Sequence, residues 1–288
     1  MRYAWIDTQR SHYSVSRLCR VLAVSRSGYC QWRGRAPSPR SLANAALDAQ
    51  VKAVYQASQQ TYGRPRIVRA LRRDHTLHVG HERVRQSLLR QSLTPVYKRR
   101  YTATTDSDHT LPVADNVLDR RFDGWLPNQA WVGDVTYIAT SEGWLYLAAI
   151  LDLGNRQVVG WALNHRMTSD IVCNALKMAY WRHKPSPGLI MHTDRGSQYC
   201  SHDHRQLLRD YGMLVSMSRR ANAWDNAVIE SFFKTLKVER VYRVRYRTRA
   251  QAALDIINWI EGFYNRTRLH SAIGYRTPVP IPAGQSVA

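Results

Sequence analysis

Three acidic residues occupy positions where a carboxylate would be costly unless it does chemistry. Asp134 lies inside the apolar stretch "AWVGDVTYIAT", Asp194 follows the apolar stretch "GLIMHT", and Glu230 lies in "NAVIESFFKTLK". Between Asp194 and Glu230 there are 35 residues, enough for a helix, a strand and the start of another helix. The three carboxylates can therefore meet only if the intervening elements fold back on one another.

Three neighbouring carboxylates repel one another unless a cation joins them. Oxygen-only ligands favour Mg²⁺ or Mn²⁺. Two such ions about 4 Å apart can activate an attacking oxygen and stabilise the leaving oxygen of a phosphodiester. The pattern predicts that Asp134, Asp194 and Glu230 hold two ions for phosphoryl transfer on nucleic acid. Asp152, in "AILDLGN", is the competing carboxylate, and we interpret it as a turn former at a strand end.

The elements around the three acids have the pattern of a mixed sheet. Three short apolar segments separated by turn residues predict an antiparallel meander at 130–140, 144–153 and 157–163. Four further elements follow: a helix at about 169–183, a strand at 188–193, a helix at 202–211 and a strand at 213–218. A long helix then begins near Trp224. This order predicts an α/β core over 127–284, with helices covering the sheet. If the strands that carry Asp134 and Asp194 are neighbours, their carboxylates converge.

The helix that begins near Trp224 has two distinct stripes. Ile229, Phe232, Phe233 and Leu236 form its apolar face. A second stripe runs along the same helix and contains Asn226, Glu230, Lys234 and Lys237. Glu230 therefore borders the buried side while reaching a site, and Lys234 on the same stripe is expected to contact DNA.

The positive charge of the chain is unevenly distributed. The net charge is +21, from 42 Lys and Arg against 21 Asp and Glu, and residues 1–100 hold 20 of the bases but only 4 of the acids. A general richness in arginine would not concentrate the charge in one third of the chain. A basic N-terminal third indicates a module that binds a polyanion, joined to a domain of another kind.

The basic third is predicted to be helical in two parts. Residues 1–40 form a helix-turn-helix-like segment, in which a second helix starts at Ser25 and a Pro/Ser spacer follows at 36–41. Residues 45–100 contain two short amphipathic helices around the turn at Val79-Gly80, which is typical of a helix-turn-helix DNA-binding domain. The arginines on its outer surface are expected to contact DNA; they include Arg64, Arg66, Arg83 and Arg85.

Two alternatives remain for this part of the chain. The arginines can instead form a solvated basic face on a helical bundle. The second alternative is a zinc site at His75, His78 and His81, but the paired cysteines typical of such a site are missing from the sequence around them.

Residues 101–126 are polar and rich in turn residues, so we expect a linker there.

Other features limit the cellular setting. No apolar run approaches the roughly 20 residues of a membrane span, and the first residues lack the apolar segment of a secretory signal. The four cysteines form no CxxC pair, so reduced thiols in a cytoplasm are expected.

Several stretches of the chain resemble one protein family. "WVGDVTYI", "LDLGNRQVVGW", "HTDRGSQY" and "NAVIESFFKTLK" closely resemble the catalytic core of the DDE transposases of the insertion sequence 3 family. "LCRVLAVSRSGYCQW" and "YGRPRIVRAL" resemble the N-terminal part of the OrfB-type product of that family, so the resemblance runs from about residue 14 to 280. It implies an RNase H-like fold similar to that of retroviral integrases. The family's acidic triad falls on Asp134, Asp194 and Glu230, and Lys237 matches a basic position that holds DNA near the active site.

The resemblance also implies an activity and partners. Such enzymes free a 3′-hydroxyl at an element end and use it to attack another phosphodiester, without a covalent protein intermediate. Their partners are the terminal repeats and the target DNA, and they work as oligomers on DNA in the bacterial cytoplasm, at the nucleoid. The OrfB-type product is commonly fused to, or assisted by, an upstream OrfA-type product that supplies a leucine zipper. Because this sequence shows no sustained heptad pattern, we expect it to depend on that product.

Two other classes of function fit parts of the sequence. One is a DNA-binding regulator whose core is intact but catalytically silent, which a metal-dependent cleavage assay separates from an enzyme. The other is an RNase H-like nuclease that cuts without strand transfer. Products joined to target DNA distinguish a transposase from that nuclease.

Overall fold

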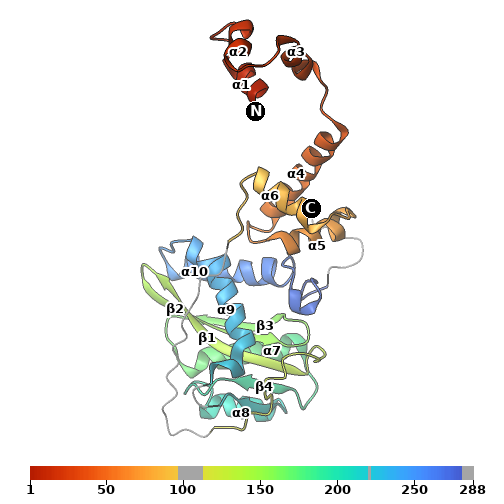
Figure 1. Ribbon diagram of the computed structural model, residues 1–288. Helices are drawn as coiled ribbons and strands as arrows, with labels where there is room; N and C mark the ends of the chain where they lie inside the picture. The colour runs from red at the N-terminus through yellow and green to blue at the C-terminus, as the bar shows by residue number, and fades with distance from the viewer. Residues whose placement is uncertain (97–112, 220–221, 281–288) are drawn as a thin grey trace. The chain divides into compact units, whose positions relative to one another are not determined.

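The computed structural model describes residues 1–96, 113–219 and 222–280 of the chain (Figure 1). These residues belong to two compact units, Met1–Val51 and Lys52–Ala288. The candidate site lies entirely in the second unit.

The first unit contains three short helices: α1 (Arg2–Gln9), α2 (Val15–Val21) and α3 (Arg26–Gly34). Ile6, Leu18, Cys19 and Tyr29 form their buried core. The sequence predicted the second helix to start at Ser25, and the Ser25 hydroxyl indeed caps α3 by accepting a hydrogen bond from the Gly28 amide at 3.0 Å. The first of the three helices was not expected.

A long helix, α4 (Pro39–Ala57), occupies a stretch in which the sequence predicted only a spacer at 36–41. The helix begins inside that spacer, with Pro39 in its first turn, a position that proline tolerates. The stretch is rich in alanine, the residue with the highest helix propensity. Leu47, Val51, Val54 and Tyr55 have the spacing of one helical face and are buried, so the sequence carried a signal for this helix that the prediction did not use.

The predicted helix-turn-helix pair is formed by α5 (Arg64–His75) and α6 (His81–Arg90). Pro65 lies in the first turn of α5, and Thr76, in a left-handed conformation at φ 50°, ends that helix. Ile67 and Leu71 on α5, together with Val84 on α6, are fully buried. These residues are spaced as the amphipathic pattern predicted.

The core contains one five-stranded sheet with the order β3-β2-β1-β4-β5. Its strands are β1 (Ala130–Thr140), β2 (Gly143–Asp152), β3 (Val158–Asn164), β4 (Ile190–Thr193) and β5 (Leu214–Met217). The first three strands form an antiparallel meander, while β4 is parallel to β1 and β5 is parallel to β4. The predicted α/β architecture, a mixed sheet flanked by helices, is confirmed.

Helices cover both faces of this sheet (Figure 1). Alternate residues of β1 point to opposite faces. Ala130 and Val132 join a cluster with residues of α9 (Ala227–Glu239), α10 (Arg249–Asn258) and the π-helical turn Trp259–Tyr264. Trp131 joins the cluster of α7 (Ser169–His183) and α8 (His202–Asp210) on the other face. The core therefore has three layers.

The described part of the expected linker is packed on the core. Residues 101–112 lie outside the described residues, but the segment 113–126, here called the pre-core segment, contributes Leu118, which is fully buried among residues of β1 and α9. The Ser216 hydroxyl accepts hydrogen bonds from the backbone amides of Val117 and Leu118, both at 3.0 Å. At the other end of the segment, a Cβ on Gly154 would lie 2.4 Å from the carbonyl carbon of Leu126. The α/β core thus begins before residue 127.

Two further observations bear on the setting of the protein. Among the described residues, no helix combines the length and apolarity required to cross a membrane. Cys19, Cys30, Cys173 and Cys200 are all free thiols.

Candidate active site

The pairing of β1 with β4 brings two of the predicted acids together. The two strands run parallel, and the last paired positions are Gly133 on β1 and Thr193 on β4. Asp134 is the next residue of β1 and Asp194 directly follows β4, so the two acids lie next to each other just beyond these paired positions. Asp134 has the same parity along β1 as Ala130 and Val132, and it therefore points to the α9 face of the sheet.

A tight turn fixes the backbone around Asp194. Its Oδ1 accepts a hydrogen bond from the Gly196 amide at 2.9 Å, an Asx-type turn that ends β4. A Cβ on Gly196 would lie 3.0 Å from that same oxygen. Next to the turn, the Arg195 guanidinium donates to the Ser218 carbonyl at 2.6 Å. The arginine beside Asp194 therefore holds the end of β4 to the residues that follow β5.

Glu230 lies in the first turn of α9, on the helix that covers this face of the sheet. Ile229 and Phe233 on either side of it are buried in the core, which fixes the rotation of the helix. The helix start is also tied to β1, because the Asn226 side-chain amide donates to the Gly133 carbonyl at 3.4 Å. The stripe predicted from the sequence is thus turned toward Asp134.

Electrostatics show that the three acids lie within range of one another. Burial, followed by the Asp194 carboxylate and then by Glu230, raises the pKa of Asp134 well above its usual value. Burial and Asp194 also raise the pKa of Glu230. Asp134 and Glu230 therefore bind a proton more readily here than in water, as expected where buried carboxylates lie close together without a cation between them.

The donor set suits a hard divalent ion. Asp134, Asp194 and Glu230 offer only carboxylate oxygens, the ligands that Mg²⁺ and Mn²⁺ prefer. The Asn226 side-chain oxygen is buried beside them and has no hydrogen-bond partner within the described ranges. Among those same residues, no group of three or more His, Cys, Asp or Glu side chains is gathered closely enough to hold a metal ion as it stands. The chemistry of the residues fits such an ion, and ligation requires the acids to draw closer.

A lysine faces the acids from two turns further along α9. Lys237 Nζ lies 4.7 Å from the centroid of the Tyr137 ring, a cation–π contact at the surface of β1. Burial lowers the pKa of Lys237, and the negative charge of Asp134 opposes that change. Lys234, also predicted to contact DNA, lies one turn earlier on the same helix and is half-buried.

The four arginines predicted to bind DNA have different surroundings. Arg64, Arg83 and Arg85 are exposed, and Arg85 forms an ion pair with Glu82 on its own helix at 2.9 Å. Arg66 is only half exposed, and its Nε donates to the Leu269 carbonyl at 3.0 Å. Tyr62, just before α5, donates to the Thr267 carbonyl at 3.2 Å and accepts from the Leu269 amide at 2.7 Å. Arg66 therefore has a structural role within the unit Lys52–Ala288, which the sequence did not indicate.

Asp152 has the role that the sequence favoured. It is buried at the end of β2, and its oxygens accept hydrogen bonds from the backbone amides of Asn128 and Gly154, both at 2.7 Å. The Trp131 indole also donates to it at 3.1 Å. With these partners Asp152 shapes the turns beside β1.

Two buried groups near the acids escaped the sequence reasoning. Tyr199 is buried, and burial, with Asp134 and Asp194, raises its pKa well above the usual value. Asp225 has a fully buried side chain that bonds Arg219 and Arg120. Tyr199 ends the motif "HTDRGSQY" and Asp225 immediately precedes Asn226, so proximity to the acids was the available signal.

The raised pKa of Asp134 predicts how this residue affects stability. A carboxyl that binds its proton more tightly in the folded than in the unfolded state makes the metal-free fold lose stability as the pH rises from the ordinary carboxyl range through the raised pKa. Asp134→Asn is therefore expected to raise the Tm in EDTA at neutral pH, by about 2–4 °C for each kcal/mol gained. The gain should shrink as the pH falls from the raised pKa toward the ordinary range of aspartate, and it should disappear below that range.

Differential scanning fluorimetry across pH measures this effect. Asp203→Asn serves as the matched control, because that carboxylate is exposed on α8. A lower Tm for Asp134→Asn than for the wild type at neutral pH in EDTA would contradict the expectation.

Comparison with known proteins agrees with this architecture. Residues 126–223 and 211–278 match integrase core domain families, and residues 41–101 match a family described as an HTH-like domain. The HTLV-2 integrase catalytic core domain, solved in complex with magnesium, matches 54% of this chain and 97% of its own, at 19% identity and a TM-score of 0.41. The chain is thus built as an integrase core preceded by an HTH-like domain.

Curated relatives narrow the class. Transposase InsF for insertion sequence IS3A of Escherichia coli (strain K12) is 40% identical over 281 residues, which cover 96% of this chain and 97% of that protein. The insertion element IS600 31 kDa protein of Shigella sonnei is 42% identical over 261 residues, covering 91% and 96%. The chain belongs to the insertion sequence 3 family of transposases.

Proposed function

We propose that this chain cleaves DNA at the ends of an insertion sequence and joins the freed 3′ ends to target DNA, with Asp134, Asp194 and Glu230 as the catalytic triad. The observation that carries the proposal is the meeting of these three acids: two strands paired in parallel deliver Asp134 and Asp194 side by side, and α9 turns Glu230 toward them. Membership of the transposase family supports the reaction class.

In the proposed mechanism, the three carboxylates hold divalent ions. Mg²⁺ or Mn²⁺, two per site, would supply an activated attacking oxygen and stabilise the leaving oxygen of the phosphodiester. Asp134 and Glu230 must both be ionised to act as ligands, and their raised pKa values mean that this requires either higher pH or the ion itself. The three carboxylates repel one another without a cation, and a bound ion would offset that repulsion.

Lys237 is proposed to hold the DNA backbone beside the acids. Its charge faces Asp134, and the Tyr137 ring lies under its ammonium group, so the side chain is kept at the edge of the site rather than free in solvent. Lys234, one turn closer to Glu230, is proposed to extend the same basic track. Both residues would contact the DNA backbone, which leaves the three carboxylates to hold the ions.

The HTH-like domain is proposed to bind the element end through α6. Arg83 and Arg85 are exposed on that helix, whereas Arg66 on α5 already bonds a carbonyl. Arg83→Ala is expected to weaken DNA binding and to reduce the salt dependence of binding by about one phosphate contact. Arg66→Ala, the matched control, should lower the Tm while changing the salt slope less. Fluorescence anisotropy at several salt concentrations measures both slopes, and a larger change for Arg66→Ala would reverse the assignment.

Pairing of two DNA ends requires more than one copy of the active site. We propose that the chain acts as a homo-oligomer on DNA, fused to or assisted by an upstream OrfA-type product, at the nucleoid in the bacterial cytoplasm. The four free cysteines fit a reducing compartment. Sedimentation of the chain with and without end DNA tests the assembly, and the flanking genomic DNA tests for an overlapping upstream frame.

The central experiment is a cleavage and strand-transfer assay. The purified protein, with and without the upstream product, is given labelled element-end DNA and a target plasmid in Mg²⁺, in Mn²⁺ or in EDTA. Metal-dependent nicking at the 3′ end, with label joined to the plasmid, is expected. Nicking without joined products would indicate a nuclease, and specific binding without nicking would indicate a regulator.

A further inference from the structure

Asp225 lies where the chain turns from β5 into the helix that carries Glu230. It belongs to the 3-10 turn η1 (Ala223–Asn226), which runs directly into α9. Its side chain is fully buried and accepts five hydrogen bonds: three from the amide, Nε and Nη2 of Arg219, one from Arg120 Nε and one from Asn116 Nδ2. All five lie between 2.8 and 3.0 Å. A buried carboxylate with this many charged and polar donors has one favoured position.

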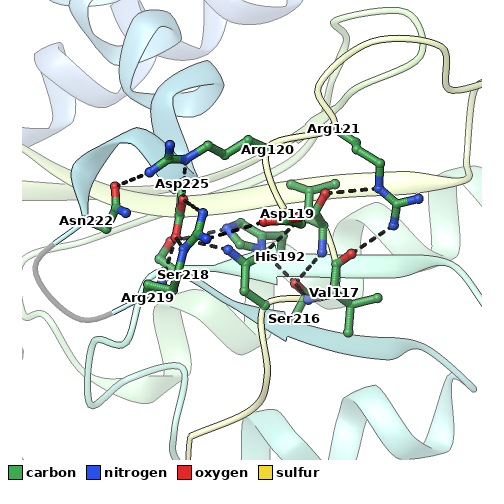
Figure 2. Close-up of polar contacts among 12 residues, drawn as sticks. Val117, Asp119, Arg120, Arg121, His192, Ser216, Ser218, Arg219, Asn222 and Asp225 are labelled. Carbon is green, nitrogen blue, oxygen red and sulfur yellow. Dashed lines mark hydrogen bonds and ion pairs between the residues drawn. The ribbon is translucent and has the colours of Figure 1, made fainter.

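The donors come from two different parts of the core (Figure 2). Arg219 follows β5, whereas Arg120 and Asn116 belong to the pre-core segment. Arg120 also donates from Nη2 to the Asn222 side-chain oxygen at 2.9 Å, so it grips the approach to η1 as well as η1 itself. Asp225 therefore joins the pre-core segment to the start of α9.

The pre-core segment is itself firmly attached to the sheet. The Ser216 hydroxyl, which accepts from the amides of Val117 and Leu118, also contacts His192 Nδ1 at 2.8 Å (Figure 2). His192 is a residue of β4, two positions before Asp194. The hydrogen-bond network thus runs from His192, close to Asp194 at the end of β4, to Asp225 at the start of α9.

We propose that Asp225 is a positioning residue, which the Arg120 and Arg219 guanidinium groups hold so that the first turn of α9 keeps Glu230 beside Asp134 and Asp194. This inference rests on the proposed role of Glu230 in the triad. The hydrogen bonds of Asp225, here called the Asp225 clamp, act on the start of α9. Glu230 lies only five residues after Asp225, so the clamp opposes the movement by which Glu230 would relieve its repulsion from the other acids. On the opposite side, Asn226 holds the same turn to the Gly133 carbonyl.

Two adjacent arginines provide a matched pair of variants. Arg120 bonds Asp225, whereas the guanidinium of Arg121 donates to the carbonyls of Val117 and Leu118 in its own segment. Arg120→Ala and Arg121→Ala remove the same charge from neighbouring positions. Asp225→Asn keeps the shape of the side chain and removes its charge. Arg120→Lys restores the charge without the planar guanidinium.

The first readout is hydrogen–deuterium exchange of the metal-free protein, which does not depend on activity. Asp225→Asn and Arg120→Ala are expected to speed exchange over residues 222–233, while α7 keeps its protection and Arg121→Ala behaves as the wild type. The second readout is the Mg²⁺ concentration that half-saturates cleavage. It should rise roughly 10–100-fold in the same two variants, as for other lost partners of metal ligands, with much of the rate regained at saturating Mg²⁺. Arg120→Lys should recover part of the loss.

Three results would overturn the proposal. Equal effects of Arg120→Ala and Arg121→Ala would mean that surface charge alone matters. Unchanged exchange over 222–233 in Asp225→Asn would mean that the clamp does not order the helix start. Faster exchange spread equally over α7 and α9 would mean a general loss of stability. Failure of the triad itself is distinguishable, because Glu230→Gln would then cleave normally while the exchange pattern still followed Asp225.

Discussion

Glu230→Gln is expected to abolish metal-dependent cleavage while leaving DNA binding intact. The amide keeps the size of the side chain but removes the negative charge that would hold an ion beside Asp134 and Asp194. Ion-based stabilisation of a phosphodiester transition state amounts to several kcal/mol, so the rate should fall by about 10³-fold or more. Asp134→Ala and Asp194→Ala should produce losses of similar size, because the three acids act as one unit.

The matched control is Glu142→Gln. Glu142 lies in the turn after β1, roughly 20 Å along the strand direction from Asp134, and accepts a hydrogen bond from the Arg249 amide at 2.8 Å. Gel-based cleavage of labelled end DNA in Mg²⁺, with anisotropy for binding, measures both properties. Cleavage by Glu230→Gln within tenfold of the wild-type rate would remove this residue from the proposed site.

Glu239→Ala is expected to cause a large loss of stability. Glu239, near the end of α9, forms a two-pronged ion pair with Arg268 at 2.6 and 2.8 Å, and both side chains are at most 5% exposed. Removing the acid leaves a buried guanidinium without its counter-charge, which costs about 3–5 kcal/mol of the free energy of unfolding. Urea unfolding followed by circular dichroism measures the change.

Two further variants separate charge from packing. Glu82→Ala breaks an exposed ion pair on α6 and should cost less than about 1 kcal/mol. The double variant Glu239→Leu/Arg268→Met replaces the buried pair by apolar side chains and should recover most of the loss. If Glu239→Ala costs no more than Glu82→Ala, the buried pair contributes little to the fold.

The strands were predictable, and the three acids could be proposed as a site, because both depend on local patterns. Alternation and turn residues located β1, β2 and β3 to within one residue at each end. The acids stood out because Asp134 interrupts an apolar strand and Asp194 ends one. What the pattern left open was whether those two strands are neighbours, and the parallel register of β1 with β4 provides that answer.

Apart from α4, the parts of the fold that were not predicted have no periodic pattern of apolar residues in the sequence. The pre-core segment contributes Leu118 to the core through one buried side chain and several hydrogen bonds, so it reads as a polar linker. The hydrogen bonds of Asp225 also follow no sequence period, because its partners Arg219 and Arg120 are 6 and 105 residues away in sequence. Arg66 looked like an outward arginine because its acceptor, the Leu269 carbonyl, is 203 residues away. Long-range polar contacts of this kind leave no trace in local composition.

The order of strands in the sheet also has a consequence for synthesis of the chain. Asp134 emerges from the ribosome early in the core, but its neighbour β4 and the helix with Glu230 follow only after the whole meander and α7. At about 5–20 residues per second, roughly 5–20 s pass between the first acid and the third. Pairings of such high sequence separation also form late in folding. Growing chains and prematurely terminated products that stop before α9 therefore lack Glu230, and with it the complete set of three acids.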